Sequence, residues 1–142
     1  MEPLLFAHLI AAGIWAGCVA TEVVLELALK HVPPNTSPLA ALHAKIDRFV
    51  ELPAILISAV TGAALLERAS FDLLLGIKVV FGVSAVVMNL VAAFTVDRRL
   101  KCLQAGDMAG YARFNVWHER VGVICILSIV GAIAAGGIRL AG

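Results

Sequence analysis

The sequence lacks most features that mark soluble binding proteins. Its 142 residues include only three cysteines, an odd number without the CxxC spacing of zinc or redox motifs. The net charge is +1, and no basic block is interleaved with aromatic residues, so the composition gives no sign of a nucleic-acid partner. The segment before Lys30 has neither a positively charged start nor a small-residue cleavage site. We therefore expect the first apolar run to remain as a membrane span rather than to be a cleaved signal peptide.

Apolar residues are abundant instead, at 61% of the chain, against about 45–50% in soluble domains. They form runs long enough to cross a bilayer as helices. The sequence thus predicts an all-α integral membrane protein, a four-helix transmembrane bundle formed by a single domain. Pro53 should kink the second helix, because it frees the carbonyl of Phe49. The predicted spans within domain 1–142 are approximately 3–31, 38–66, 72–103 and 108–138.

Basic residues are unevenly distributed between the two ends of the predicted bundle. Eight flank the first and third connections, whereas Arg68, Lys78 and Arg139 lie toward the other end. By the positive-inside rule, both termini lie on the outer side of a cell membrane, as in a bacterial inner membrane. The eight are Lys30, Lys45, Arg48, Arg98, Arg99, Lys101, Arg113 and Arg120.

One face of the first span carries all of its strongly polar residues. At about 100° per residue, His8, Trp15, Glu22 and Glu26 fall within about 40° of one another. A charged residue at the bilayer centre costs about 2.5 kcal/mol or more, so these groups should face protein, a cofactor or water. Gly13 and Gly17 form a GxxxG pair on another side, where a second helix could approach closely.

Two polar groups are expected at different depths, and the outer one contains His8 and Lys78. Each lies five or six residues from the outer end of its helix, so the two should be level. An intramembrane histidine in a four-helix bundle suits haem iron, and the lysine could pair with a propionate. Alternatively, His8 is a satisfied core histidine and Lys78 extends to the membrane surface. Trp15 would pack in the core or form a cofactor wall.

The inner group is denser and is predicted to bind a transition-metal ion. Histidine and carboxylate side chains pointing into a bundle suit iron, manganese, zinc or copper(II). The alternative is an ion-pair network completed by Arg48, Arg98, Arg99 or Arg120. The candidate metal ligands are Glu22, Glu26, His43, Asp47, Glu51 and His118.

Several short motifs are distributed over most of the chain. They are His8 followed by Trp15, Ala16 and Gly17, then Leu52, Pro53, Ala54 and Gly62, then Lys78, Phe114 and Asn115. With these motifs the sequence resembles the HemJ-type protoporphyrinogen oxidases and the broader CopD-like copper-resistance membrane domains. The HemJ resemblance implies a haem b cofactor, with His8 and Lys78 as functional residues.

Three functions are compatible with these patterns. The first is a haem b redox protein, an oxidoreductase in the HemJ manner, with an electron-transfer partner. The second is a CopD-like metal-binding or metal-transport protein that uses the inner group and a metal-delivery partner. The third is a structural membrane subunit whose polar residues pair with one another. A homo-oligomer is compatible with each of them.

The charge asymmetry leads to a labelling prediction. In a cysteine-free variant, a cysteine introduced at Thr36 should be protected from membrane-impermeant thiol reagents in intact cells, because its connection faces the cytoplasm. A cysteine introduced at Ala141 should react. Labelling at Thr36 from outside would overturn this orientation.

Overall fold

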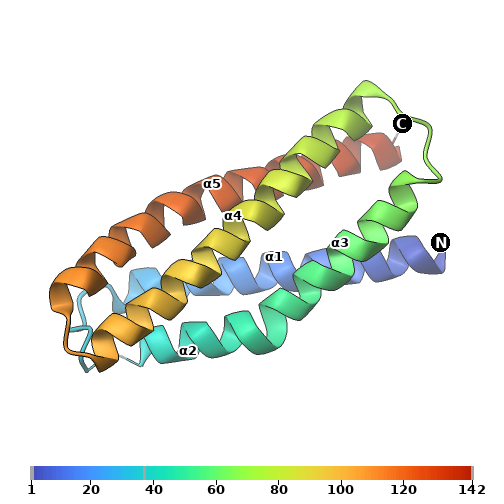
Figure 1. The fold of residues 1–142 in the computed structure, drawn as a ribbon. Coiled ribbons are helices and arrows are strands. Elements are labelled where there is room, and N and C mark those ends of the chain that lie inside the picture. The colour runs from blue at the N-terminus through green and yellow to red at the C-terminus, as the bar shows by residue number, and fades with distance from the viewer. Residues whose placement is uncertain (1, 37, 142) are drawn as a thin grey trace.

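A computed structural model describes residues 2–36 and 38–141 of the chain, and its regular structure there is helical throughout. The two ends of the chain lie at the same end of the bundle (Figure 1). The connections between α1 and α2 and between α4 and α5 lie at the other end, which we call the loop end. The elements are α1 (Pro3–Leu29), α2 (Leu39–Ile46), η1 (Asp47–Glu51), α3 (Leu52–Leu66), α4 (Leu73–Gln104) and α5 (Met108–Ala141).

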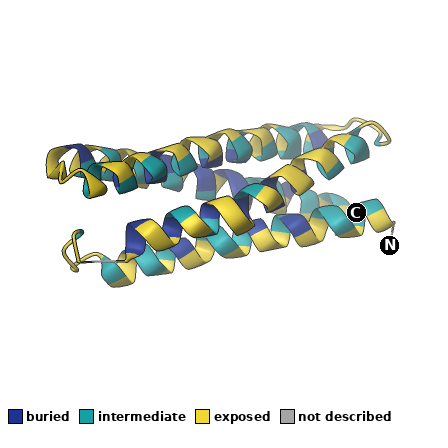
Figure 2. Cartoon of the chain, turned by 60° about the horizontal axis from the view of Figure 1, so that its bottom comes forward, coloured by how far each residue is buried: buried dark blue, intermediate teal, exposed yellow. Residues whose placement is uncertain are grey.

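Four helical stretches are long and apolar enough to cross a membrane, because α2, η1 and α3 form one continuous stretch. Buried residues lie on the faces that the helices turn toward one another, and the outward faces are exposed (Figure 2). Large apolar side chains dominate this exposed surface; Phe49, Phe71 and Leu73 are 73–80% exposed. Such a surface is expected where lipid, rather than water, is the solvent.

The predicted interruption near Pro53 takes the form of a π-helical turn. Pro53 is the second residue of α3, and η1 directly precedes it. Because proline lacks an N–H group, it cannot bond to the carbonyl one turn earlier, and the wider turn accommodates this missing bond. The helix changes direction between α2 and α3 (Figure 1). This turn carries Asp47 and Glu51, which are both buried.

The helices pack in two main pairs, α4 with α5 and α1 with α3. A close approach within the first pair requires Gly131, since a Cβ atom there would lie 2.8 Å from the ring of Phe81. The central core cluster combines Trp15 with small and branched residues from the other helices. By contrast, a Cβ atom at Gly13 or Gly17 would meet nothing within 4 Å. The predicted GxxxG packing side therefore has no partner within the described part of the chain.

Polar caps fix the helix ends outside the apolar spans. The carboxylate of Asp72 accepts a hydrogen bond from the backbone N–H of Leu75 at 2.7 Å and pairs with Arg139 at 2.9 Å. These two contacts, the backbone bond first, hold the pKa of Asp72 below its ordinary value. Asp107 likewise accepts a bond from the N–H of Gly110 at 2.8 Å. Each carboxylate thus caps the first turn of the helix that follows it.

Candidate metal centre

All six predicted inner residues line one cavity of about 440 Å³ near the loop end. On α1, and again along α2 and η1, they are spaced four residues apart, which places them on one face of each helix. The cavity lies mainly between α1 and α5, which do not form one of the main packing pairs. Apolar side chains such as Val23 and Ile126 form its walls. The structure thus brings together the residues that the sequence predicted to converge.

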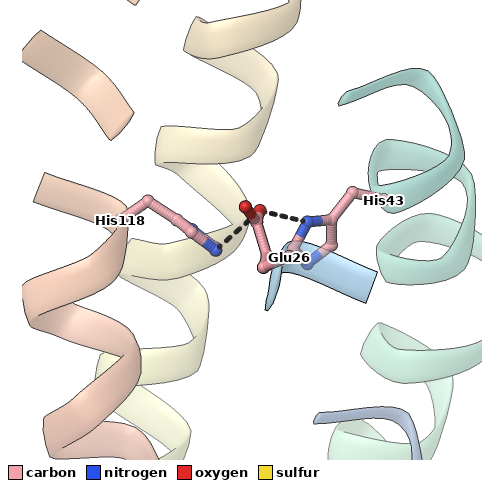
Figure 3. Close-up of side chains that lie close together, drawn as sticks. All are labelled: Glu26, His43 and His118. Atoms are coloured by element: carbon pink, nitrogen blue, oxygen red, sulfur yellow. Dashed lines mark ion pairs between the residues drawn. The ribbon is translucent and has the colours of Figure 1, made fainter. Parts of the chain in front are cut away.

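Glu26 lies at the centre of the group, between two histidines (Figure 3). Its Oε1 atom is 3.3 Å from Nδ1 of His43 and 3.8 Å from Nε2 of His118. The two imidazole rings meet edge to face, with centroids 5.0 Å apart. One carboxylate and two imidazoles from three different helices therefore converge on one point.

The ring of His118 is oriented by a hydrogen bond on its far side. The hydroxyl of Thr95 donates to the carbonyl of Ala92 at 2.7 Å, so its oxygen is free to accept a bond from Nδ1–H of His118 at 3.2 Å. We assign the tautomer from this network. In this tautomer Nε2 carries a lone pair and faces Glu26. A proton or a metal ion between these two acceptors, which are 3.8 Å apart, would make their contact favourable.

His43 contacts a second carboxylate through its other nitrogen. Its Nε2 atom lies 3.0 Å from Oε2 of Glu22, which is one helical turn before Glu26. His43 is only 3% exposed, and Asp47 follows it one turn later. Two overlapping groups of possible metal ligands result, Glu26 with His43 and His118, and Glu22 with His43 and Asp47. In each group the ligand atoms lie within 4.8 Å of one another.

One buried arginine balances part of this negative charge. Arg99 is fully buried, and its Nη2 atom donates to Oε1 of Glu26 at 2.8 Å. Its Nε and Nη1 atoms have no hydrogen-bond partner in the part of the chain that the structure describes. Arg48, Arg98 and Arg120, which the sequence offered as alternatives, are exposed. The predicted ion-pair alternative is thus present at one carboxylate and is supplied by Arg99.

The deeper carboxylates lack such a partner. Glu22 Oε1, Asp47 Oδ2 and Glu51 Oε1 are buried and have no hydrogen-bond partner among the described residues. Leaving a buried acceptor unpaired costs about 1–3 kcal/mol, and more for a charged group. Three such atoms in one cavity indicate that the protein side chains alone do not complete this region.

The two residues of the outer group bond to or pack against other residues. His8 bonds through Nδ1 to the carbonyl of Ser58 at 3.0 Å, and a Cβ atom at Gly62 would lie 3.0 Å from its ring. Lys78 lies against Gly136 of α5, where a Cβ atom would be 3.3 Å from its Cε. Lys78 is nevertheless near enough for its charge to act on the imidazole of His8. Neither residue lines the cavity described above.

Trp15 belongs to the core. Its indole N–H donates to Oδ1 of Asn89 at 2.9 Å, and both residues are buried. The thiol of Cys125 donates to the same oxygen at 3.3 Å. This network adjoins the cavity, because Asn89 and Cys125 also line it. The predicted packing role of Trp15 agrees with these contacts.

Sequence reasoning did not single out Thr95, and it did not separate Arg99 from Arg98. The helical period does distinguish the two arginines. At about 100° per residue, Arg98 lies about 180° from Asn89, whereas Arg99 lies only about 80° away. Arg99 is thus on the polar side of α4 and Arg98 faces outward. No comparable signal marks Thr95, because threonine is common on both faces of membrane helices.

Comparison with protein-family models, with curated proteins and with solved structures found no match to this chain.

The buried arginine leads to a stability prediction. Arg99→Ala should lower the free energy of unfolding by about 1–3 kcal/mol, because it removes the hydrogen-bonded cation from the partly buried Glu26 carboxylate, which then faces only the two histidines. The exposed Arg120 provides a matched control. Arg120→Ala should change the free energy of unfolding by about 0.5 kcal/mol or less. Unfolding of both variants in the same detergent measures the difference. Equal effects would contradict the central place of Arg99, and adding Glu26→Ala should restore part of the loss.

Proposed function

We propose that this protein is an integral membrane protein that binds a divalent transition-metal ion inside its helical bundle. The observation that carries the proposal is the lone pair of His118 Nε2, which faces the Glu26 carboxylate beside the ring of His43 (Figure 3). Two imidazoles and a carboxylate form a ligand set typical of zinc and other first-row divalent ions.

The distances are compatible with an ion of this kind. Metal–ligand bonds to nitrogen and oxygen are about 2.0–2.2 Å long, so two ligands of one ion lie up to about 4.3 Å apart. The three ligand atoms lie within 4.8 Å of one another, so small side-chain rotations close the site. The hydrogen bond from His118 to Thr95 supplies the support on the far ring nitrogen that metal-binding histidines usually have.

The position of the group favours metal handling over a purely structural role. Arg99 pairs with Glu26 and His43 contacts Glu22, but one oxygen each of Glu22, Asp47 and Glu51 has no hydrogen-bond partner among the described residues. The cavity also gives the group a route to the outside of the bundle between α1 and α5. We propose that the ion enters from the loop end, on the cytoplasmic side of a cell membrane, as part of metal binding or transport of the CopD-like kind.

Metal-dependent stability tests this function. Zn²⁺ should raise the melting temperature of the purified protein, because an ion that binds only the folded state adds about 2.7 kcal/mol at a hundred times its Kd. His43→Ala should abolish the increase. His31, on the exposed connection after α1, provides the control, and His31→Ala should retain it. If neither Zn²⁺ nor a chelator changes the melting temperature of the wild-type protein, the metal-site proposal is wrong.

A haem b protein is the second candidate, and one observation favours it. The bond between Nδ1 of His8 and the Ser58 carbonyl leaves Nε2 of His8 available, as in many metal-binding histidines. The residues around His8 fit an axial ligand, but Lys78 is turned toward Gly136 and would have to reorient to pair with a propionate. This candidate rests on the resemblance to HemJ-type oxidases as well as on the histidine.

An absorption spectrum separates the two candidates. If His8 ligates haem iron, the protein purified from haem-replete cells should show a Soret band. His8→Ala should lose or shift this band while the protein still inserts into membranes, and His31→Ala should leave it unchanged. A colourless wild-type protein from such cells would exclude the haem function.

A further inference from the structure

The two nitrogens of the His43 ring face different ligand groups. Nδ1 faces Glu26 at 3.3 Å, and Nε2 faces Glu22 at 3.0 Å. The lone-pair directions of the two ring nitrogens diverge, so a single ion cannot bind both of them. The ring therefore separates the inner group into two sides.

Each side is completed by a different residue. His118 joins Glu26 on the side nearer the loop end, and Asp47 joins Glu22 on the deeper side. On α1 the two carboxylates are one turn apart, which corresponds to about 5.4 Å along the helix. Each side offers one imidazole nitrogen, at least one carboxylate oxygen and one further ligand, all within 4.8 Å of one another.

The deeper side is the one without an arginine. Arg99 contacts Glu26 and so serves the side near the loop end. On the deeper side, Glu22 Oε1 and Asp47 Oδ2 are buried without a hydrogen-bond partner among the described residues. His43 and Asp47 are 3% and 5% exposed. Glu51, 1% exposed, presents a further unpaired oxygen one turn beyond Asp47.

We propose that the bundle holds two metal positions that share His43, one nearer the loop end at Glu26, His43 and His118 and a deeper one at Glu22, His43 and Asp47. For clarity, we call them the loop-end position and the deep position. This inference rests on the proposed metal-binding function and adds a second site to it. Two ions bound together would require His43 to release its remaining N–H proton to water, so that each ring nitrogen donates one electron pair to one ion.

Metal stoichiometry of paired variants tests the two positions. After equilibration with Zn²⁺ and removal of free metal, elemental analysis should find two zinc ions per wild-type chain. His118→Ala should retain one, held at the deep position, and Asp47→Asn should retain one, held at the loop-end position. His43→Ala should lose both.

Matched controls distinguish these losses from general damage. His31→Ala and Asp97→Asn alter a histidine and an aspartate outside the cavity and should retain two ions. If Asp47→Asn fails to give a folded protein by circular dichroism and gel filtration, Glu22→Gln removes a different ligand of the same position and should also retain one ion.

The outcomes separate this inference from the function on which it rests. One ion in the wild type that is lost in both His118→Ala and Asp47→Asn would mean a single composite site, which overturns the shared-histidine proposal and leaves metal binding intact. No ion in the wild type would overturn the metal-binding function itself. One ion that persists in both variants would support two positions filled alternately.

Copper(II) provides an independent measurement of the shared ring. Two copper(II) ions bridged by one imidazole are magnetically coupled, so the electron paramagnetic resonance signal of the two-copper protein should fall well below that of two isolated ions. His118→Ala, loaded with one copper ion, should give the full signal of one ion. A full uncoupled signal from the two-copper wild type would show that the positions do not share His43.

Discussion

A single carboxylate oxygen, Oε1 of Glu26, joins three of the helices to α1. It accepts a hydrogen bond from Arg99 of α4 and faces His43 of α2 and His118 of α5. Apart from these contacts, α1 packs chiefly on α3. The relative rotation of α1 and α5 at the loop end, and hence the cavity between them, depends on how these three side chains are arranged around one oxygen.

Burying these charged groups lowers the stability of the fold, so we expect the arrangement to serve a function. Burying charged groups costs several kcal/mol per ion, and replacing a buried ion pair with apolar residues of similar volume is often neutral or stabilising. The α4 and α5 pair shows that this sequence builds close apolar contacts where stability alone is needed, as at Phe81 and Gly131. Charged and polar residues inside apolar spans are therefore functional candidates.

The chemistry of the cavity limits which ions it could bind. Its ligand groups are imidazole and carboxylate, which suit borderline and hard divalent ions better than copper(I). The thiol of Cys125 donates to Asn89 and belongs to the core beside Trp15 rather than to either ligand group. The π-helical turn before Pro53 presents Asp47 and Glu51 to the cavity. The same break that bends the second span thus contributes to the site.

The amino-acid sequence by itself determined the helical spans, a helix start near Asp72 and another at Asp107, and the polar faces of the first two spans. These follow from local rules, because apolar run length, capping chemistry and a helical period of about 3.6 residues act within one segment. It also predicted the six residues of the inner group. The same period places Arg99, and not Arg98, on the polar side of α4.

Only the tertiary structure decided how those faces meet. Equal depth suggested that His8 and Lys78 would lie close together, but it gave no sign that His8 bonds to Ser58 or that Lys78 packs against Gly136. The sequence likewise did not indicate that Thr95 bonds to His118. It also did not indicate that the two ring nitrogens of His43 face different carboxylates, Glu22 and Glu26. Periodicity gives the angle of a side chain about its own helix axis. The rotation and separation of neighbouring helices come from packing between segments distant in sequence, which no single segment encodes.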